Sequence, residues 1–158
     1  KAPPEDAVAR KLVHMKRVIC GTPAYFAAHG EPRMPHELAL HPCFSYMLAE
    51  ENRVWRLVDR NGEEISVPVS SKFHFNNIDC ILNAVLAGHG LAMLPTYLCG
   101  PELARGTLKR IFDDLEPVSS MGRFLYACYT PSRVRVPKVR AFLAELENLF
   151  DPLPPWDR

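Results

Sequence analysis

Three polar side chains stand directly before predicted helices, where unpaired backbone amides can bind an anion. Thr22 precedes Pro23, and Asn76 and Asn77 precede an amphipathic run that begins at Ile78. A Thr or Asn in this position caps a helix, and the amides and dipole at the same end favour a negatively charged group. Either Asn76 or Asn77 is the expected cap. A cap in this position can share the backbone amides with a bound anion.

The other reactive side chains do not form a known catalytic or metal-binding pattern. His36 and His41 are five residues apart, whereas the zinc-protease motif needs two His four residues apart on one helix face. No Ser or Cys lies in a Gly-x-Ser-x-Gly elbow, and no pair of acids has catalytic spacing. The turn Gly88-His89-Gly90 follows a helix and precedes a strand, the reverse of a dinucleotide-binding turn. We therefore expect no metal, no cofactor and no enzymatic activity.

The cysteines are odd in number and widely spaced, and no two form a Cys-x-x-Cys pair: Cys20, Cys43, Cys80, Cys99 and Cys128. Four of the five stand in apolar surroundings, which indicates reduced core thiols in a cytoplasmic protein. The alternative is that Cys99 or Cys128 is redox-reactive. A lone cysteine among apolar residues is more often an inert part of the core.

Length and composition are those of a globular protein. The 158 residues fit one domain, or one domain and a piece of a second. A net charge of +1 gives no reason to expect that this segment binds nucleic acid. No apolar run approaches the roughly 20 residues of a membrane span, and no signal peptide is found. The start at Lys1 and the Pro-rich end indicate a fragment.

The clearest element is a helix followed by a turn and a buried strand. Gly88 suits the left-handed end of this helix, Gly90 permits a tight turn, and 91–94 is a short apolar strand before Pro95. The apolar face of the helix recurs at helical spacing: Ile78, Ile81, Leu82, Val85 and Leu86.

The remaining elements alternate between strands and helices, which predicts an α/β fold with a mixed, mostly parallel sheet. Residues 1–16 are expected to form an exposed loop, and Trp156 to lie in a disordered tail. The Asn61-Gly62 pair predicts a hairpin. Strands are expected over 17–20, 41–47, 55–58, 65–69, 107–112 and 124–129, and helices over 23–29, 35–40, 101–105 and 137–150. The last helix carries an apolar stripe: Val139, Phe142, Leu143, Leu146, Leu149 and Phe150.

Several segments, in collinear order over roughly residues 8 to 150, resemble LysR-type transcriptional regulators. They include Cys20-Gly-Thr-Pro-Ala-Tyr-Phe-Ala-Ala-His-Gly30, Asn76-Asn77, Ala87-Gly-His-Gly-Leu-Ala-Met-Leu-Pro95, Leu103-Ala-Arg-Gly106 and Val139-Arg-Ala-Phe142. The resemblance implies the C-terminal part of the effector-binding (substrate-binding) domain. Its fold is periplasmic-binding-protein-like (type II), with a Rossmann-like subdomain and a fragment of the paired subdomain.

The same resemblance implies how the chain is divided. Residues 1–20 end the first subdomain and include a crossover, and 21–128 form the second subdomain. Residues 129–150 return to the first subdomain as the C-terminal helix, and 151–158 are a flexible tail. The winged helix–turn–helix that would bind DNA is absent from this sequence. Relatives are dimers, or tetramers when full-length, so a homo-oligomer is expected.

The implied function is to sense a small effector in the cleft between the subdomains and so modulate DNA-dependent transcription in a bacterial cytoplasm. Two helix N-termini directed at the cleft predict an organic acid as the effector. The alternative is a solute-binding protein or transport receptor of the same fold, against which stand the free thiols and the missing signal peptide. The residues expected to bind the effector are Thr22, Met47, Phe75, Asn76, Asn77 and Met93.

Overall fold

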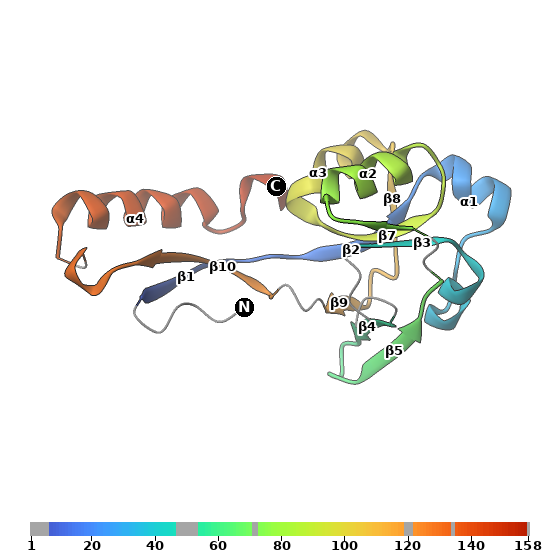
Figure 1. The fold of residues 1–158 in the computed structure, drawn as a ribbon, viewed down its shortest axis with the longest axis horizontal. Helices are drawn as coiled ribbons and strands as arrows, with labels where there is room; N and C mark the ends of the chain where they lie inside the picture. Colours follow the sequence, from blue (N-terminus) through green and yellow to red (C-terminus); the bar gives the residue numbers. More distant parts are fainter. Residues whose placement is uncertain (1–6, 47–53, 71–72, 119–121, 134, 158) are drawn as a thin grey trace. The chain divides into compact units, whose positions relative to one another are not determined.

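The computed structural model describes residues 7–46, 54–70, 73–118, 122–133 and 135–157. Contacts divide the chain into two compact units, each drawn in Figure 1. Unit 1 contains Lys1–Met15 and Ser120–Arg158, and unit 2 contains Lys16–Ser119. The boundaries expected after residues 20 and 128 would divide two strands, β2 (Arg17–Gly21) and β10 (Phe124–Tyr129). The contacts place both boundaries before these strands.

A five-stranded sheet in the order β6-β3-β7-β2-β8 forms the centre of unit 2. Parallel pairing joins β6 to β3 and β3 to β7, whereas β2 is antiparallel to both β7 and β8. The expected mixed sheet is confirmed, but parallel pairs are not the majority among the described strands. Besides β2, the strands are β3 (Cys43–Tyr46), β6 (His74–Phe75), β7 (Leu91–Pro95) and β8 (Lys109–Ile111).

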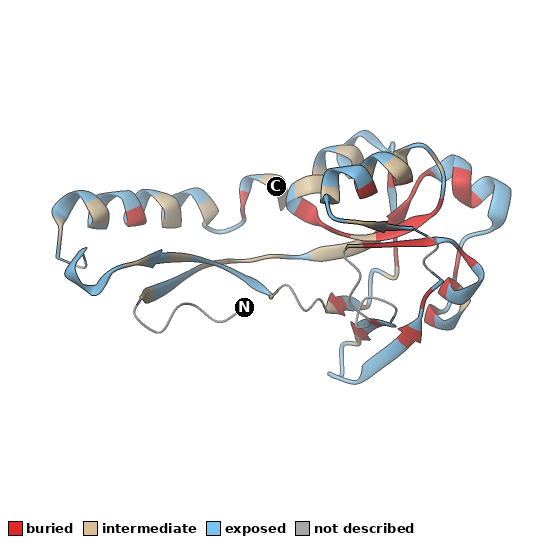
Figure 2. Cartoon of the chain, in the orientation of Figure 1, coloured by how far each residue is buried: buried red, intermediate tan, exposed pale blue. Residues whose placement is uncertain are grey.

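Two helices, α2 (Ile78–Leu86) and α3 (Thr96–Arg105), cover one face of this sheet (Figure 1). The α2 helix begins and ends as predicted, because Asn77 caps it and Gly88 adopts a φ of 77°. Buried residues concentrate between these helices and the sheet (Figure 2). We call this cluster the helix-side core: Cys20, Phe44, Ile81, Val85, Ala92, Leu94, Cys99 and Leu108.

The opposite face of the sheet packs on α1 (Pro23–His29), on the 3₁₀ turn η1 (Pro35–Leu40) and on a second sheet, in the order β5-β4-β9. Its strands are β4 (Val54–Val58), β5 (Glu64–Pro68) and β9 (Glu116–Val118). The predicted hairpin is confirmed, since Val58 pairs with Glu64 across the turn that contains Gly62. We call the second cluster the hairpin-side core: Ile19, Tyr25, Phe26, Leu38, Cys43, Trp55, Leu57, Val67, Val69, Leu91 and Ile111.

The α3 helix is longer than predicted. It begins at Thr96 rather than at Pro101, although Pro101 lacks the amide that would bond to the preceding turn. Burial of Cys99 and packing of Leu103 on the helix-side core stabilise the helix despite this missing bond. The next strand is shorter than predicted, because the amides of Thr107 and Leu108 donate to Glu102 O and so cap α3.

Unit 1 contains β1 (Val8–His14), β10, the 3₁₀ turns η3 (Pro131–Arg133) and η4 (Pro155–Asp157), and α4 (Pro137–Phe150). The expectation of a loop over residues 1–16 is wrong for β1, which pairs antiparallel with β10. The partner strand is distant in sequence, so local composition did not reveal the pairing. The α4 helix is confirmed, and an ion pair between Arg10 Nη2 and Glu147 Oε2 (2.8 Å) joins it to β1.

The apolar stripe of α4 is only partly covered. Leu143 is 5% exposed, whereas Phe142 is 63% exposed. The end of the chain packs more closely than expected, because the rings of Trp156 and Phe150 lie 5.6 Å apart and Pro154 is buried. The prediction of a disordered Trp156 is therefore wrong.

Candidate functional site

Polar and aromatic residues of unit 2 gather where the parallel strands end. β3 ends at Tyr46, β6 ends at Phe75 and β7 ends at Pro95, while the antiparallel β2 begins beside them at Arg17. Both α2 and α3 start from this side of the sheet. We call it the carboxyl edge. Open α/β sheets bind their ligands outside the carboxyl ends of the strands.

Three of the expected site residues lie together at the carboxyl edge. Asn77 is the helix cap, since its Oδ1 accepts a hydrogen bond from the Asp79 amide at 2.8 Å. Asn76 is exposed and directly precedes this cap, so its side chain is placed at the N-terminus of α2 without capping it. Phe75 packs edge-to-face on Phe44, with ring centroids 5.9 Å apart, which anchors the segment to the sheet.

Thr22 lies at the opposite edge of the sheet. Because β2 is antiparallel to β7, the end of β2 lies beside the start of β7. The Thr22 hydroxyl accepts a hydrogen bond from the Tyr25 amide (3.1 Å), and a Cβ placed on Gly88 would lie 3.7 Å from that hydroxyl. Gly88 and Asn77 flank the two ends of α2, a nine-residue helix about 14 Å long. The two helix caps therefore do not converge on one ligand.

The apolar strand ends expected to wall the site are Cys20, Met47 and Met93. Met93 lies in the middle of β7 and packs against the hairpin-side core, on the face of the sheet away from α2. Cys20 is fully buried in the helix-side core. Met47 lies outside the described residues.

Arg17 and Thr96 are two polar residues at the carboxyl edge that were not among the predicted site residues. Arg17 pairs in register with Pro95; burial lowers the pKa of Arg17, and the nearby Tyr97 acts in the opposite direction. The amide and hydroxyl of Thr96 donate to Lys16 O, at 3.0 and 3.4 Å, which fixes the start of α3 to the start of β2. The sequence feature that could have indicated positive charge here is the pair of adjacent cations, Lys16 and Arg17, at the start of a predicted strand.

A cluster of one tyrosine and two histidines joins α1 to the residue after η1, and its Tyr25 and His41 side chains are buried. The Tyr25 hydroxyl and His41 Nδ1 are 2.9 Å apart, and the His29 ring stacks on the Tyr25 ring at 4.4 Å. Burial and the neighbouring His29 lower the pKa of His41, while Glu37 opposes that effect. Burial also raises the pKa of Tyr25, with a smaller contribution from Cys43. The lowered pKa of His41 favours its neutral imidazole, and the tautomer of that ring decides whether Nδ1 accepts from or donates to the Tyr25 hydroxyl.

Acid is expected to destabilise unit 2 through His41. A histidine whose pKa is lower in the folded state binds protons more readily when unfolded. The free energy of unfolding should therefore be highest above the ordinary histidine pKa of about 6.5 and decrease as the pH falls towards the lowered value. Urea unfolding of the wild type and of His41→Gln between pH 7.5 and 5 measures the effect. An equally steep decrease in His41→Gln would contradict this assignment.

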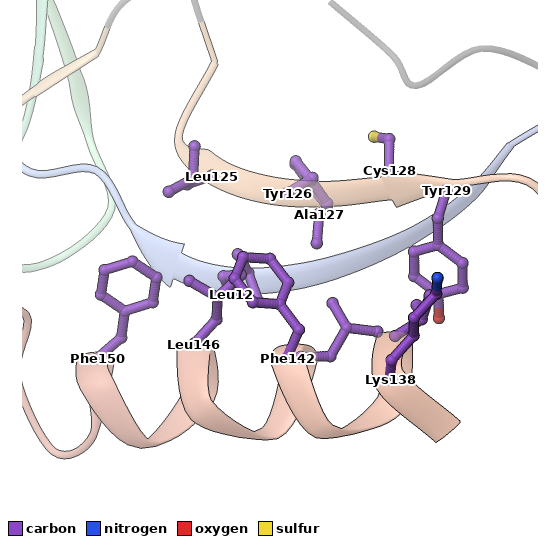
Figure 3. A pocket seen from close by; sticks show the side chains of 12 residues that line it. Leu12, Leu125, Tyr126, Ala127, Cys128, Tyr129, Lys138, Phe142, Leu146 and Phe150 are labelled. Carbon is purple, nitrogen blue, oxygen red and sulfur yellow. The ribbon is translucent and has the colours of Figure 1, made fainter. Parts of the chain in front are cut away.

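Among the described residues, a cavity of ligand size lies in each unit, and neither of these two is lined by the expected effector residues. The cavity in unit 1 has a volume of about 570 Å³ and lies between α4 and the β1–β10 pair (Figure 3). Leu12, Phe142 and Leu146 are among its apolar lining residues, and Lys138 and Tyr129 lie at the same end of it. The cavity in unit 2, about 630 Å³, lies beside Pro23, Leu108, Lys109 and Arg110.

Metal-binding and membrane-spanning features are not found in the described part of the chain. No three His, Cys, Asp or Glu side chains within the described ranges come together as metal ligands. No helix over those ranges is long and apolar enough to cross a membrane. All five cysteines are free, and Cys20, Cys43 and Cys99 are buried whereas Cys80 and Cys128 are exposed. Three core thiols are therefore observed, where four were expected.

Comparison with known families gives a match over nearly the whole chain. The sequence model of the LysR substrate-binding domain matches residues 1–151. The chain belongs to this family. The assignment confirms the resemblance to LysR-type regulators that the collinear segments indicated.

Named relatives of this LysR domain are transcriptional regulators. A putative transcriptional regulator of Pseudomonas aeruginosa is 31% identical over 113 residues, covering 71% of this chain and 37% of the relative. The regulator PtxR of the same species is 30% identical over 140 residues, covering 89% of this chain and 44% of the relative. The LysR chain thus spans less than half the length of these relatives.

Solved structures show the same fold. The full-length Vibrio cholerae virulence activator AphB matches with a TM-score of 0.76 at 22% identity, covering 93% of this chain and 49% of that chain. The regulatory domain of CrgA from Neisseria meningitidis matches with a TM-score of 0.72 at 24% identity, covering 94% of this chain and 71% of that chain. The expected type II periplasmic-binding-protein-like fold of the LysR domain is confirmed.

Proposed function

We propose that this LysR domain binds a small organic acid at the carboxyl edge of unit 2. Within a complete cytoplasmic regulator, such binding would modulate transcription through a DNA-binding domain outside this sequence. The observation that carries the proposal is the position of Asn76, exposed beside the N-terminus of α2 and at the same edge as Arg17. Backbone amides, a carboxamide and a guanidinium together suit a carboxylate.

Charge at the carboxyl edge supports an anion over a cation. Lys16 and Arg17 supply positive charge at the start of β2, and the dipole of α2 adds to it at Asn77. Asp79, exposed in the first turn of α2, supplies an opposing negative charge. Replacing Asp79 with Asn should therefore tighten the binding of a carboxylate.

The family supports sensing over transport and catalysis. The matching domain model and the named relatives are those of transcriptional regulators, which does not favour a solute-binding transport receptor. The relatives carry the names of regulators, which gives no support to an enzymatic function.

Calorimetry on the complete effector domain, with a panel of carboxylates, amines and neutral sugars, tests the class of ligand. Carboxylates are expected to bind, and Arg17→Gln should weaken their affinity about tenfold or more. Arg110→Gln is the matched control, because it removes the same charge from a residue that is paired with Asp113 (2.7 Å) away from the carboxyl edge. Binding confined to amines or sugars would overturn the proposal.

The two asparagines should separate stability from binding. Asn77→Ala removes the α2 cap and is expected to cost about 1 kcal/mol of unfolding free energy. Asn76→Ala should leave the melting temperature almost unchanged but reduce the response to the effector in a reporter assay of the intact regulator. An unchanged dose–response for Asn76→Ala would remove Asn76 from the site.

Self-association is expected through the apolar cavity of unit 1, between α4 and the β1–β10 pair. Phe142 is 63% exposed and lines the cavity beside α4, so water contacts an aromatic ring that association would bury. We expect a dimer or larger species by light scattering at tens of micromolar. Phe142→Ser should shift it towards the monomer, and Leu40→Ser, which changes another exposed apolar side chain, should not. A stable wild-type monomer would count against this expectation.

A further inference from the structure

Two buried cysteines from distant parts of the sequence are neighbours in the helix-side core. Cys20 lies on β2 and Cys99 lies in the first half of α3, and both are 0% exposed. Their thiols are hydrogen-bonded to each other. Cys20 Sγ also lies 3.9 Å from Ala92 O, and Cys99 Sγ lies 3.4 Å from Pro95 O. These contacts hold the two sulfur atoms side by side.

We propose that Cys20 and Cys99 form an intramolecular disulfide when the domain meets hydrogen peroxide or an organic hydroperoxide. One thiolate attacks the peroxide, so that a sulfur–oxygen bond forms, the oxygen–oxygen bond breaks and hydroxide or alkoxide leaves. The neighbouring thiol then attacks the resulting sulfenic acid and releases water. The two sulfur atoms together lose two electrons, and the peroxide accepts them.

The arrangement favours this product over other oxidation products. Because the second thiol is already in contact with the first, it can trap a sulfenic acid before a further peroxide converts it to sulfinic acid. The hydrogen bond with Cys99 and burial both favour the protonated thiol and raise the pKa of Cys20, so little thiolate is present in the core. The first step should therefore be slow and restricted to small oxidants.

Cys43 provides a matched comparison within the same unit. It is 1% exposed, and burial raises its pKa to about 12, but it belongs to the hairpin-side core, away from Cys20 and Cys99. Its thiol donates to Leu38 O at 3.7 Å. Cys43 therefore shares the burial of the pair without a neighbouring thiol.

The cross-link would constrain the carboxyl edge. It would join β2 to α3, and the first turn of α3 carries Thr96 and Tyr97 beside the start of β2. Oxidation should thus restrict movement of this turn. Formation of the disulfide does not depend on the proposed effector, so its test is independent of that function.

Differential alkylation and peptide mass spectrometry test the pair. The folded domain is first treated with N-ethylmaleimide, which blocks the exposed Cys80 and Cys128, and is then exposed to hydrogen peroxide. After unfolding, a heavier maleimide labels every remaining thiol. We expect Cys20 and Cys99 to lose this second label together, to appear as one linked peptide and to regain the label after reduction. Cys43 should keep its label throughout.

Two variants sharpen the outcome. In Cys20→Ala, no disulfide-linked peptide that contains Cys99 should appear. In Cys43→Ala, the peptide that links Cys20 to Cys99 should form as it does in the wild type. If Cys20→Ala does not fold, the wild-type linked peptide alone decides. The proposal is overturned if Cys20 and Cys99 keep the second label at peroxide levels that oxidise Cys80 in unblocked protein. Equal oxidation of Cys43 would overturn it as well, because burial rather than proximity would then govern the reaction.

Discussion

Gly90→Ala is expected to reduce the unfolding free energy of unit 2 by about 3 kcal/mol or more. A Cβ at this position would lie 2.3 Å from Pro42 O, and the residue has a φ of 155°. The oxygen cannot retreat freely, because it accepts the hydrogen bond from the Leu91 amide at 2.9 Å. Urea unfolding followed by circular dichroism measures the loss.

Gly106→Ala is the matched control for Gly90→Ala. Gly106 also has a positive φ, of 74°, but no atom lies within 4 Å of its added Cβ. Its replacement should cost about 1 kcal/mol, from backbone conformation alone. The difference between the two variants isolates the clash with Pro42, and equal losses would show that no clash occurs.

Leu94→Ala is the second substitution with a large expected effect, a loss of about 2–5 kcal/mol. Leu94 is 0% exposed and lies in the helix-side core, where it packs with the side chains that α2 and α3 direct at the sheet. Truncation leaves a cavity beneath the two helices that begin at the carboxyl edge.

Leu40→Ala is the control for Leu94→Ala, because it makes the same chemical change at an exposed position. It deletes the same atoms from a side chain that is 82% exposed, so its unfolding free energy should change by no more than about 0.5 kcal/mol. Chemical denaturation of both variants under one set of conditions gives the comparison. A loss in Leu94→Ala as small as that in Leu40→Ala would contradict the placement of Leu94 in the core.

Elements with strong local signals were predicted correctly. The helix α2 has an apolar face, a capping asparagine and Gly88 at its end, all within a dozen residues. Thr22, Pro23 and Gly30 define α1 in the same way, and both ends of that helix are confirmed. Such features depend on neighbours in sequence, so the sequence alone is sufficient to predict them.

Features that depend on distant partners were not predictable in this way. β1 lies in a polar segment and becomes a strand because β10 pairs with it. Pro101 signals the start of a helix locally, yet tertiary packing of Cys99 extends α3 back to Thr96. The hypothesis of two converging helix N-termini depended on the direction of β2. Only its antiparallel pairing with β7 places Thr22 and Asn77 at opposite edges.

The pairing of β1 with β10 also has a consequence for the order of folding. Arg10 and Glu147 are 137 residues apart, so unit 1 must close a very long loop before β1 can contact β10 and α4. Unit 2 is the segment inside that loop, and β2 and β9, near its two ends, contact each other once it has folded. Folding of unit 2 would therefore shorten the effective loop. We expect unit 2 to fold first and unit 1 to follow it, with nucleation governed by the helix-side and hairpin-side cores.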